Sequence, residues 1–354
     1  MPRIAIVDKI HEDGINLLKK NPKFQYEIIE DLSKENLISK LSAFDGITLR
    51  RGKIDSEILN QTKFHYNWLE LRKYANERQL SMIGDIPIFV AHDSADVWAH
   101  PHLFQLEKDG YPSVVAGVPP DYFSEDGQRW GTVLYRWEEH RAENFKWWRE
   151  RMSRMMRLFD IVRIDHFRGF HSAWAISVED NHARNGYWQD GPKDEIIKQI
   201  IDEVGDNSKI IAEDLGIIPP EVIDLRKRNN LNGMAVLQFG FDGDLSSNPH
   251  YPSNIGSDLV AYTGTHDNDT TRGWLNSLNG ETLENIKQVT NVDEIVVKDI
   301  IQLAVSSKAE MVIIPIQDFL NIDSRGRMNT PGIAEGNWKW SFEWEDLENA
   351  SLIV

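Results

Sequence analysis

Hydrophobic and polar residues along the chain follow two spacings, which predict alternating strands and helices. In the first 62 residues, apolar runs predict strands at 4–7, 24–29 and 46–49, and amphipathic stretches predict helices at 12–20, 34–41 and 56–61. Single strands that alternate with helices favour a parallel sheet with crossover helices. This part of the chain is therefore predicted to be a small, flavodoxin-like βα segment.

From Phe64 onward the alternation continues with longer elements. The spacing of Phe64, Trp68, Leu71 and Ala75 predicts an amphipathic helix. Further strands are predicted at 82–90, 160–164, 209–213, 234–239, 259–263 and 311–316, and further helices at 145–159, 194–204, 220–228 and 294–308. The fold class is α/β. Polar residues at the carboxyl ends of several strands favour a TIM-type (β/α) barrel, with a doubly wound sheet as the alternative.

Two features suggest how the chain is organised. The whole chain has 12 tryptophans but residues 1–62 have none, which predicts a domain boundary near Thr62 and a second domain at 63–354. Residues 91–137 show little periodicity and many Asp, Gly and Pro residues. A structureless stretch of that length inside a compact domain is usually a functional loop or a sign of wrongly assigned elements, and we interpret it as a functional loop.

Composition narrows the choice of partners. The net charge of −17 disfavours nucleic acid and anionic membranes, and no run of apolar residues is long enough to span a membrane. The absence of cysteine excludes disulfides and zinc thiolate sites. It fits a cytoplasmic protein, as does the N-terminal segment, which is too charged for a signal peptide. His92, His100 and His102 lack a convincing ligand spacing, so we expect no metal and no other cofactor. The oligomeric state is left open.

Three carboxylates each follow an apolar, strand-like run: Asp165 in DIVRIDHF, Glu213 in KIIAEDLG and Asp267 in VAYTGTHDND. Retaining glycoside chemistry uses one carboxylate as nucleophile and one carboxylic acid as proton donor. Arg163 lies two residues before Asp165 on the same face of the strand, where its charge would keep the carboxylate ionised. Burial and the adjacent acid Asp214 would raise the pKa of Glu213.

Each of these motifs has an alternative interpretation. Arg163 and Asp165 could be a structural ion pair, Glu213 and Asp214 could cap a helix, and THDNDT around Asp267 could be a polar turn. Three such acids at three strand ends are better explained by one shared site than by three unrelated structural roles.

From about Phe64 to Trp340 the chain closely resembles the amylomaltase family of 4-α-glucanotransferases. The matching segments are IGDIPIFVAHDSADVWAHPHLF, VAGVPPDYFSEDGQRWG, VRIDHFRGF, IIAEDLG, TGTHDNDT and IQDFLNIDSRGRMNTPG. The resemblance implies a barrel enzyme of carbohydrate metabolism, a glycosyltransferase that moves α-1,4-glucan segments between maltooligosaccharides through a covalent glucosyl-enzyme.

The resemblance also implies roles for individual residues. Asp165 would be the nucleophile, Glu213 the acid/base and Asp267 the carboxylate that stabilises the distorted sugar, with His266 beside it. Arg163 would support the nucleophile and Asp85 would line the donor site. Two loops would cover the cleft, one with Tyr122, Phe123, Gln128 and Trp130, the other with Asn329.

The N-terminal part departs from the family. Amylomaltases begin their barrel with two strands that precede the segment matching Phe64, and residues 1–62 instead resemble the N-terminus of D-3-phosphoglycerate dehydrogenases, in IAIVDKIHEDGINLL and DLSKENLISKLSAFDGITLRRGKID. The chain is thus predicted to be an apparent fusion with a truncated barrel. Two alternatives to an active transferase follow, a catalytically inactive glucan-binding remnant and a dehydrogenase fragment. The second is disfavoured because the chain has no G-x-G-x-x-G motif.

Overall fold

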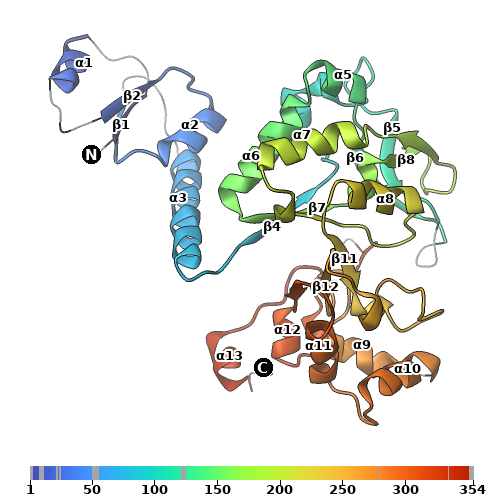
Figure 1. Cartoon of the computed structure of the whole chain (residues 1–354). Helices are drawn as coiled ribbons and strands as arrows, with labels where there is room; N and C mark the ends of the chain where they lie inside the picture. The colour runs from blue at the N-terminus through green and yellow to red at the C-terminus, as the bar shows by residue number, and fades with distance from the viewer. Residues whose placement is uncertain are drawn as a thin grey trace. The chain divides into compact units, whose positions relative to one another are not determined.

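The computed structural model describes residues 3–7, 12–20, 23, 25–49, 56–120, 125–278, 280–333 and 335–350. It divides the chain into two compact units, one of Met1–Ile83 with Arg157–Asp160 and one of Gly84–Met156 with Ile161–Val354 (Figure 1). None of the described helices is both long enough and apolar enough to cross a membrane.

The first unit contains a three-stranded parallel sheet in the order β2-β1-β3 (β1 Arg3–Val7, β2 Gln25–Ile29, β3 Gly46–Leu49). Helices α1 (Glu12–Lys19) and α2 (Lys34–Leu41) connect the strands. Ala5 and Val7 of the central strand are fully buried and pack with Ile29, Leu37 and Leu41. The strand and helix order predicted for this segment is confirmed.

Helix α3 (Ser56–Asn76) is continuous, where the sequence predicted two separate helices. The predicted boundary near Thr62 therefore lies inside a helix. The side chain of Arg72 pairs with Asp160 at 2.7 Å, and the Trp68 indole donates to the carbonyl of Leu158 at 2.9 Å. These contacts explain why Arg157–Asp160 belongs to the first unit.

Six short parallel strands form the centre of the second unit. Their bounds are β4 Ile83–Pro87, β7 Ile161–Asp165, β10 Ile210–Ala212, β11 Gly233–Val236, β12 Leu259–Tyr262 and β13 Met311–Ile313. They form two sheets, in the orders β10-β7-β4 and β11-β12-β13, and a parallel bridge between Ile211 and Asn232 links β10 to the start of β11. Each strand thus lies next to the one that follows it in this series. All residues of β10 and β11 are buried, as expected for parallel strands.

Helices accompany these strands (Figure 1). The periodicity predicted α6 Lys146–Leu158, α7 Asp194–Val204, α8 Pro220–Arg228 and α11 Val297–Val305. It did not predict α9 Thr271–Ser277, α10 Gly280–Thr290, α12 Ile316–Phe319, which follows β13, or α13 Trp344–Asn349. Helix α7 has two acidic residues in its first turn, and Gly205, directly after its last residue, has a left-handed backbone. These two features explain where the helix begins and ends.

The stretch 91–137 is not structureless, contrary to the sequence analysis. It contains α4 (Ala95–Ala99), β5 (Val114–Val118), β6 (Gln128–Val133) and the start of α5 (Trp137–Ala142). Strands β5 and β6 join β8 (Ser172–Ser177) and β9 (Tyr187–Asp190) in an antiparallel sheet of order β6-β5-β8-β9. Local patterns missed this sheet because β5 pairs with β8, a segment far away along the chain.

Candidate active site

The candidate nucleophile and the candidate acid lie at the carboxyl ends of neighbouring parallel strands. Asp165 is the last residue of β7, and Glu213 follows directly after β10. The Glu213 amide donates to the Ile164 carbonyl at 3.0 Å, and the Glu213 carbonyl accepts from the Phe167 amide at 3.1 Å. The main chain of the two strands therefore fixes both carboxyl groups at the same edge of the sheet.

Arg163 connects Asp165 with Asp85. One guanidinium nitrogen donates to Asp165 at 2.8 Å and another to Asp85 at 2.6 Å, while the Arg163 side chain itself is only 11% exposed. Burial raises the pKa of the Asp85 carboxyl, and the charge of Arg163 acts against that rise. A single buried cation thus compensates two carboxylates, one within β4 and one at the end of β7.

Glu213 has the environment of a proton donor. Its pKa is raised to about 7, first because the carboxyl group is buried and then because Asp165 is close; Arg163 and the amides of Leu215 and His166 act against the rise. Those amides donate to the two Glu213 carboxyl oxygens at 2.9 and 2.6 Å. A carboxyl group with this pKa holds its proton in near-neutral solution and can transfer it.

The expected cause of that shift was partly wrong. Asp214, the neighbouring acid, points to other partners: its carboxylate pairs with Arg226 at 2.9 Å and accepts the Met234 amide at 2.9 Å. Its charge is compensated there, so burial and Asp165 account for the raised pKa of Glu213. The partner Arg226 lies in α8, which the local sequence around Glu213 does not reveal.

His166 is a site residue that the sequence analysis missed. It has a left-handed backbone, with a φ of 55°, and this conformation directs its amide toward Glu213. Its ring lies 4.7 Å from the Trp130 ring and 6.2 Å from the Phe89 ring, measured between centroids. Burial lowers the pKa of His166 to about 3, so the ring is neutral at physiological pH. The available signal was its position directly after Asp165.

Asp267 lies in the loop between β12 and α9. The Asn329 side-chain amide donates to the Asp267 carboxylate at 2.6 Å, and the Asn329 main-chain amide donates to the His266 carbonyl at 3.0 Å. Arg327 donates to the Asp267 carbonyl at 2.8 Å, and the His266 ring lies 3.6 Å from the Asp267 carboxylate. Two segments distant in sequence, around Asp267 and Asn329, are thus joined by hydrogen bonds, a contact that the sequence analysis did not predict.

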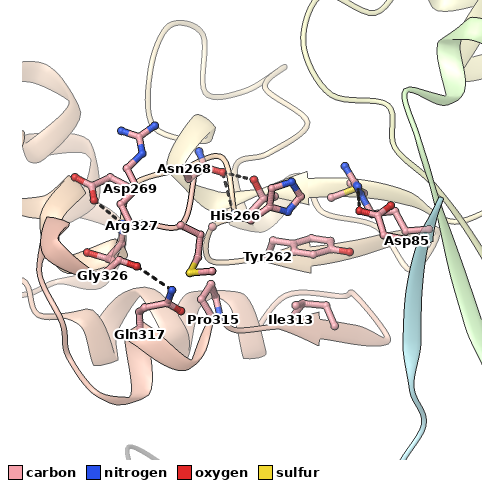
Figure 2. Close-up of a pocket in the computed structure, with 16 residues that line it drawn as sticks. Asp85, Tyr262, His266, Asn268, Asp269, Ile313, Pro315, Gln317, Gly326 and Arg327 are labelled. Carbon is pink, nitrogen blue, oxygen red and sulfur yellow. Dashed lines mark hydrogen bonds and ion pairs between the residues drawn. The ribbon is translucent and has the colours of Figure 1, made fainter. Parts of the chain in front are cut away.

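A cavity of about 250 Å³ lies beside these residues, but Asp165, Glu213 and Asp267 are not among the residues that line it. It is lined by Asp85, Arg163, Met234, Tyr262, Gly264, Thr265, His266, Asn268, Asp269, Thr270, Ile313, Pro315, Gln317, Gly326, Arg327 and Met328. Figure 2 shows Asp85 at one end and Asp269 and Gln317 at the other, with His266 and Tyr262 between them. The sequence analysis named Asp85, Arg163 and His266 among these residues. The others lie on strand ends and loops whose convergence only the fold reveals.

The remaining predicted site residues are those expected in the loop over the acceptor side of the cleft. Gln128 and Trp130 lie on β6, and the Trp130 indole donates to the Gln128 side chain at 3.2 Å. Trp130 reaches the site through its ring contact with His166. Tyr122 and Phe123 lie outside the described residues.

The histidines considered as metal ligands have other contacts. The His92 ring bonds with the carbonyl of Gly110 at 2.8 Å, and the His102 ring with the carboxylate of Glu143 at 2.7 Å. In the part of the chain that the structure describes, no cluster of three His, Asp or Glu residues could hold a metal ion.

Comparison with known proteins gives a consistent result. A family model described as 4-alpha-glucanotransferase matches residues 35–346. The chain is 46% identical over 307 residues to the chloroplastic/amyloplastic 4-alpha-glucanotransferase of Solanum tuberosum, covering 84% of this chain and 53% of that protein. It is 45% identical over 286 residues to the 4-alpha-glucanotransferase of Synechocystis sp., covering 80% of this chain and 56% of that protein. The chain thus spans about half the length of these relatives.

Solved structures agree. The amylomaltase from Streptococcus agalactiae in complex with acarbose is 35% identical, with a TM-score of 0.78 over 82% of this chain and 60% of that chain. The amylomaltase from Corynebacterium glutamicum, 16% identical with a TM-score of 0.69 over 94% of this chain and 53% of that one, shares the fold. The family match begins at residue 35, inside the segment that resembles phosphoglycerate dehydrogenases. That second resemblance stays a prediction. On the strength of the match over residues 35–346, the chain belongs to the 4-alpha-glucanotransferase family.

Proposed function

We propose that this chain transfers α-1,4-glucan segments between maltooligosaccharides by a retaining double displacement. One observation carries the proposal: Glu213, with a pKa raised to about 7, lies beside an Asp165 that is ion-paired with Arg163, at the ends of adjacent strands. A protonated acid next to an ionised carboxylate is the pair that retaining glycoside chemistry requires.

In the first step, the Asp165 carboxylate attacks the anomeric carbon of the donor glucan. The bond from that carbon to the glycosidic oxygen breaks, and Glu213 gives its proton to the departing oxygen. The product is a glucosyl ester of Asp165, a free glucan end and an ionised Glu213. The guanidinium of Arg163, 2.8 Å from Asp165, orients the attacking carboxylate.

In the second step, Glu213 acts as a base. It takes the proton of the 4-hydroxyl of an acceptor glucan while that oxygen attacks the anomeric carbon and displaces Asp165. Two inversions give net retention. Transfer exceeds hydrolysis only if water is kept from the ester, and the aromatic side chains of Trp130 and Phe89 around His166 are suited to exclude it.

Asp267 and its neighbours hold the reacting sugar. The side chains of Asp267 and His266 present adjacent acceptors and donors to sugar hydroxyls, and Asn329 fixes the Asp267 carboxylate at 2.6 Å. Asp85, which lines the same cavity as His266, contacts the donor. Gln128 and Trp130, with Tyr122 and Phe123, belong to the acceptor side.

We also propose a barrel fold for the second unit. The six parallel strands, each beside the next, form part of a (β/α) barrel whose active site lies at the carboxyl ends of its strands. The likeness to the amylomaltase from Streptococcus agalactiae supports this assignment. The flavodoxin-like nature of residues 1–62 and a cytoplasmic location stay predictions.

One observation favours a second candidate function, a glucan-binding protein without turnover. Strands β4 and β13 are edge strands of the described sheets, and the Asp85 side chain on β4 is 48% exposed. A donor site with that exposure would bind glucan while failing to exclude water or position the donor.

Incubation of the purified chain with maltotriose, followed by mass spectrometry of the products, tests the proposal. We expect glucose together with a series of longer maltooligosaccharides, and neither in the Asp165→Asn variant. Binding of maltooligosaccharide by a folded protein that forms no products would instead establish the second candidate.

A further inference from the structure

Aromatic residues occupy alternate positions in the segment WKWSFEW near the end of the described chain. We name Trp338, Trp340 and Phe342 the aromatic strip. The strip precedes α13 (Figure 1), and neither helix nor strand includes it. Family motifs used above to assign the site end before this segment, so no role for the strip follows from them.

Trp338 begins the strip directly beside the candidate active site. Its ring centroid lies 5.3 Å from that of His266, and the two ring planes are inclined by 39°. The Trp338 amide donates to the Met328 carbonyl at 2.7 Å, next to Asn329, which binds Asp267. The same loop therefore fixes both the carboxylate Asp267 and the Trp338 ring.

Two features of Trp338 are unusual for a residue with only a packing role. It is 59% exposed although its main chain is hydrogen-bonded, and its φ is 60°, a region that large side chains rarely adopt. Such backbone strain is concentrated at ligand sites. The loop keeps a large aromatic face in solvent at the edge of the site.

The other two rings of the strip pack against each other. The ring centroids of Trp340 and Phe342 lie 5.8 Å apart with their planes inclined by 32°, and Phe342 is 37% exposed. Aromatic faces bind apolar C–H surfaces, and the glucose units of a linear glucan present one such face per ring. Glu343 and Glu345 follow the strip, and their charge disfavours polyanions such as nucleic acid.

We propose that the aromatic strip binds an α-1,4-glucan chain outside the reacting centre, with one glucose unit stacked on Trp338. The proposal rests on the proposed function only for the identity of the ligand. It predicts that the strip contributes more to long glucans than to short ones, because each additional ring contact requires a further glucose unit.

The test compares Trp338→Leu, Trp338→Phe and the control Trp98→Leu, which removes an 83% exposed tryptophan in α4. Binding of maltoheptaose and maltotriose is measured by calorimetry in the Asp165→Asn background, so turnover is not needed. One lost ring contact corresponds to a roughly 3- to 10-fold weaker affinity. We expect that loss for maltoheptaose in Trp338→Leu, recovery in Trp338→Phe, a smaller effect with maltotriose and none in Trp98→Leu.

Two results would overturn the proposal. One is unchanged maltoheptaose affinity in a folded Trp338→Leu variant. The other is an equal loss of affinity for both sugars without recovery in Trp338→Phe, since that pattern means that Trp338 only supports His266. Coverage of the strip by a second copy would appear as a change of oligomeric state in Trp338→Leu with glucan affinity intact. If Asp165→Asn binds glucan but the unsubstituted chain forms no products from maltotriose, the proposed function fails while the strip is still tested.

Discussion

At the scale of single residues, the raised pKa of Glu213 is the property on which the chemistry depends. A proton donor must be protonated in the free enzyme, so kcat/KM for maltotriose should fall as the pH rises through about 7, the pKa of Glu213. A pH profile of the initial rate checks this. A profile that stays flat to pH 9 would mean that another group donates the proton.

The same pKa links Glu213 to stability. A carboxyl group whose pKa is raised on folding from 4.5 to about 7 contributes stability below pH 4.5 and loses it as the pH rises through 7. The variant Glu213→Gln has no such loss. At pH 8 we expect its free energy of unfolding to exceed that of the unsubstituted chain by about 3 kcal/mol at most, and to show no excess at pH 4.5. Urea denaturation at both pH values measures the difference, and an excess that is the same at both would contradict the assignment.

The candidates Asp165, Glu213 and Asp267 could be proposed from sequence because each follows an apolar run, and Arg163 because it shares a strand face with Asp165. His166 could not, because its contribution is a main-chain amide directed by a left-handed φ of 55°. The pairing of Asp214 with Arg226 was also out of reach, since it joins two elements in space.

At the scale of elements, Arg226 of α8 holds three strand ends together. Its side chain, 3% exposed, pairs with Asp214 after β10 and with Asp258 before β12, and it donates to the Leu231 carbonyl before β11 at 2.9 Å. Apart from Arg226, the β-bridge described between β10 and the start of β11 is a single one, between Ile211 and Asn232.

Removing that cation should therefore cost far more than removing an exposed one. Arg226→Met leaves buried carboxylate charge without its partner and should lower the free energy of unfolding by about 3–5 kcal/mol. Arg228→Met, two residues along the same helix, breaks an exposed pair with Asp194 and should cost about 1 kcal/mol or less. Denaturant unfolding of both variants measures this, and similar losses would contradict the role given to Arg226.

The parallel strands were predictable because burial on both faces makes them continuous apolar runs, as in β10 and β11. The antiparallel sheet was not, because its strands β5 and β8 come from segments 54 residues apart whose pairing no local pattern indicates. Helix α3 was divided in two because composition changes near Thr62, while the main chain continues through it.

At the scale of the whole molecule, the proposed barrel has two edges, β4 and β13. In the described part of the chain β13 pairs with β12 alone, whereas β12 pairs on both sides. Amide hydrogens of β13 should therefore exchange with solvent faster than those of β12, which hydrogen–deuterium exchange with peptide mapping can resolve. Equal protection would show that a further strand covers the edge.

Family membership was the most predictable property of the molecule, because the motifs recur over a long stretch. The position of residues 1–62 was the least predictable. Their elements follow from periodicity, but the family model matches from residue 35 and α3 continues past the composition break near Thr62. The division into 1–62 and 63–354 stays a prediction.

The central claim, a covalent intermediate on Asp165, has a direct test. Glu213→Gln removes the acid/base, and a maltosyl fluoride donor needs no proton donor for its leaving group, so the ester should form and persist. Mass spectrometry of the intact protein and of its peptides should find a maltosyl adduct on the peptide containing Asp165, absent when Asp165→Asn is added. An adduct on a different residue, or release of fluoride without an adduct, would contradict this account.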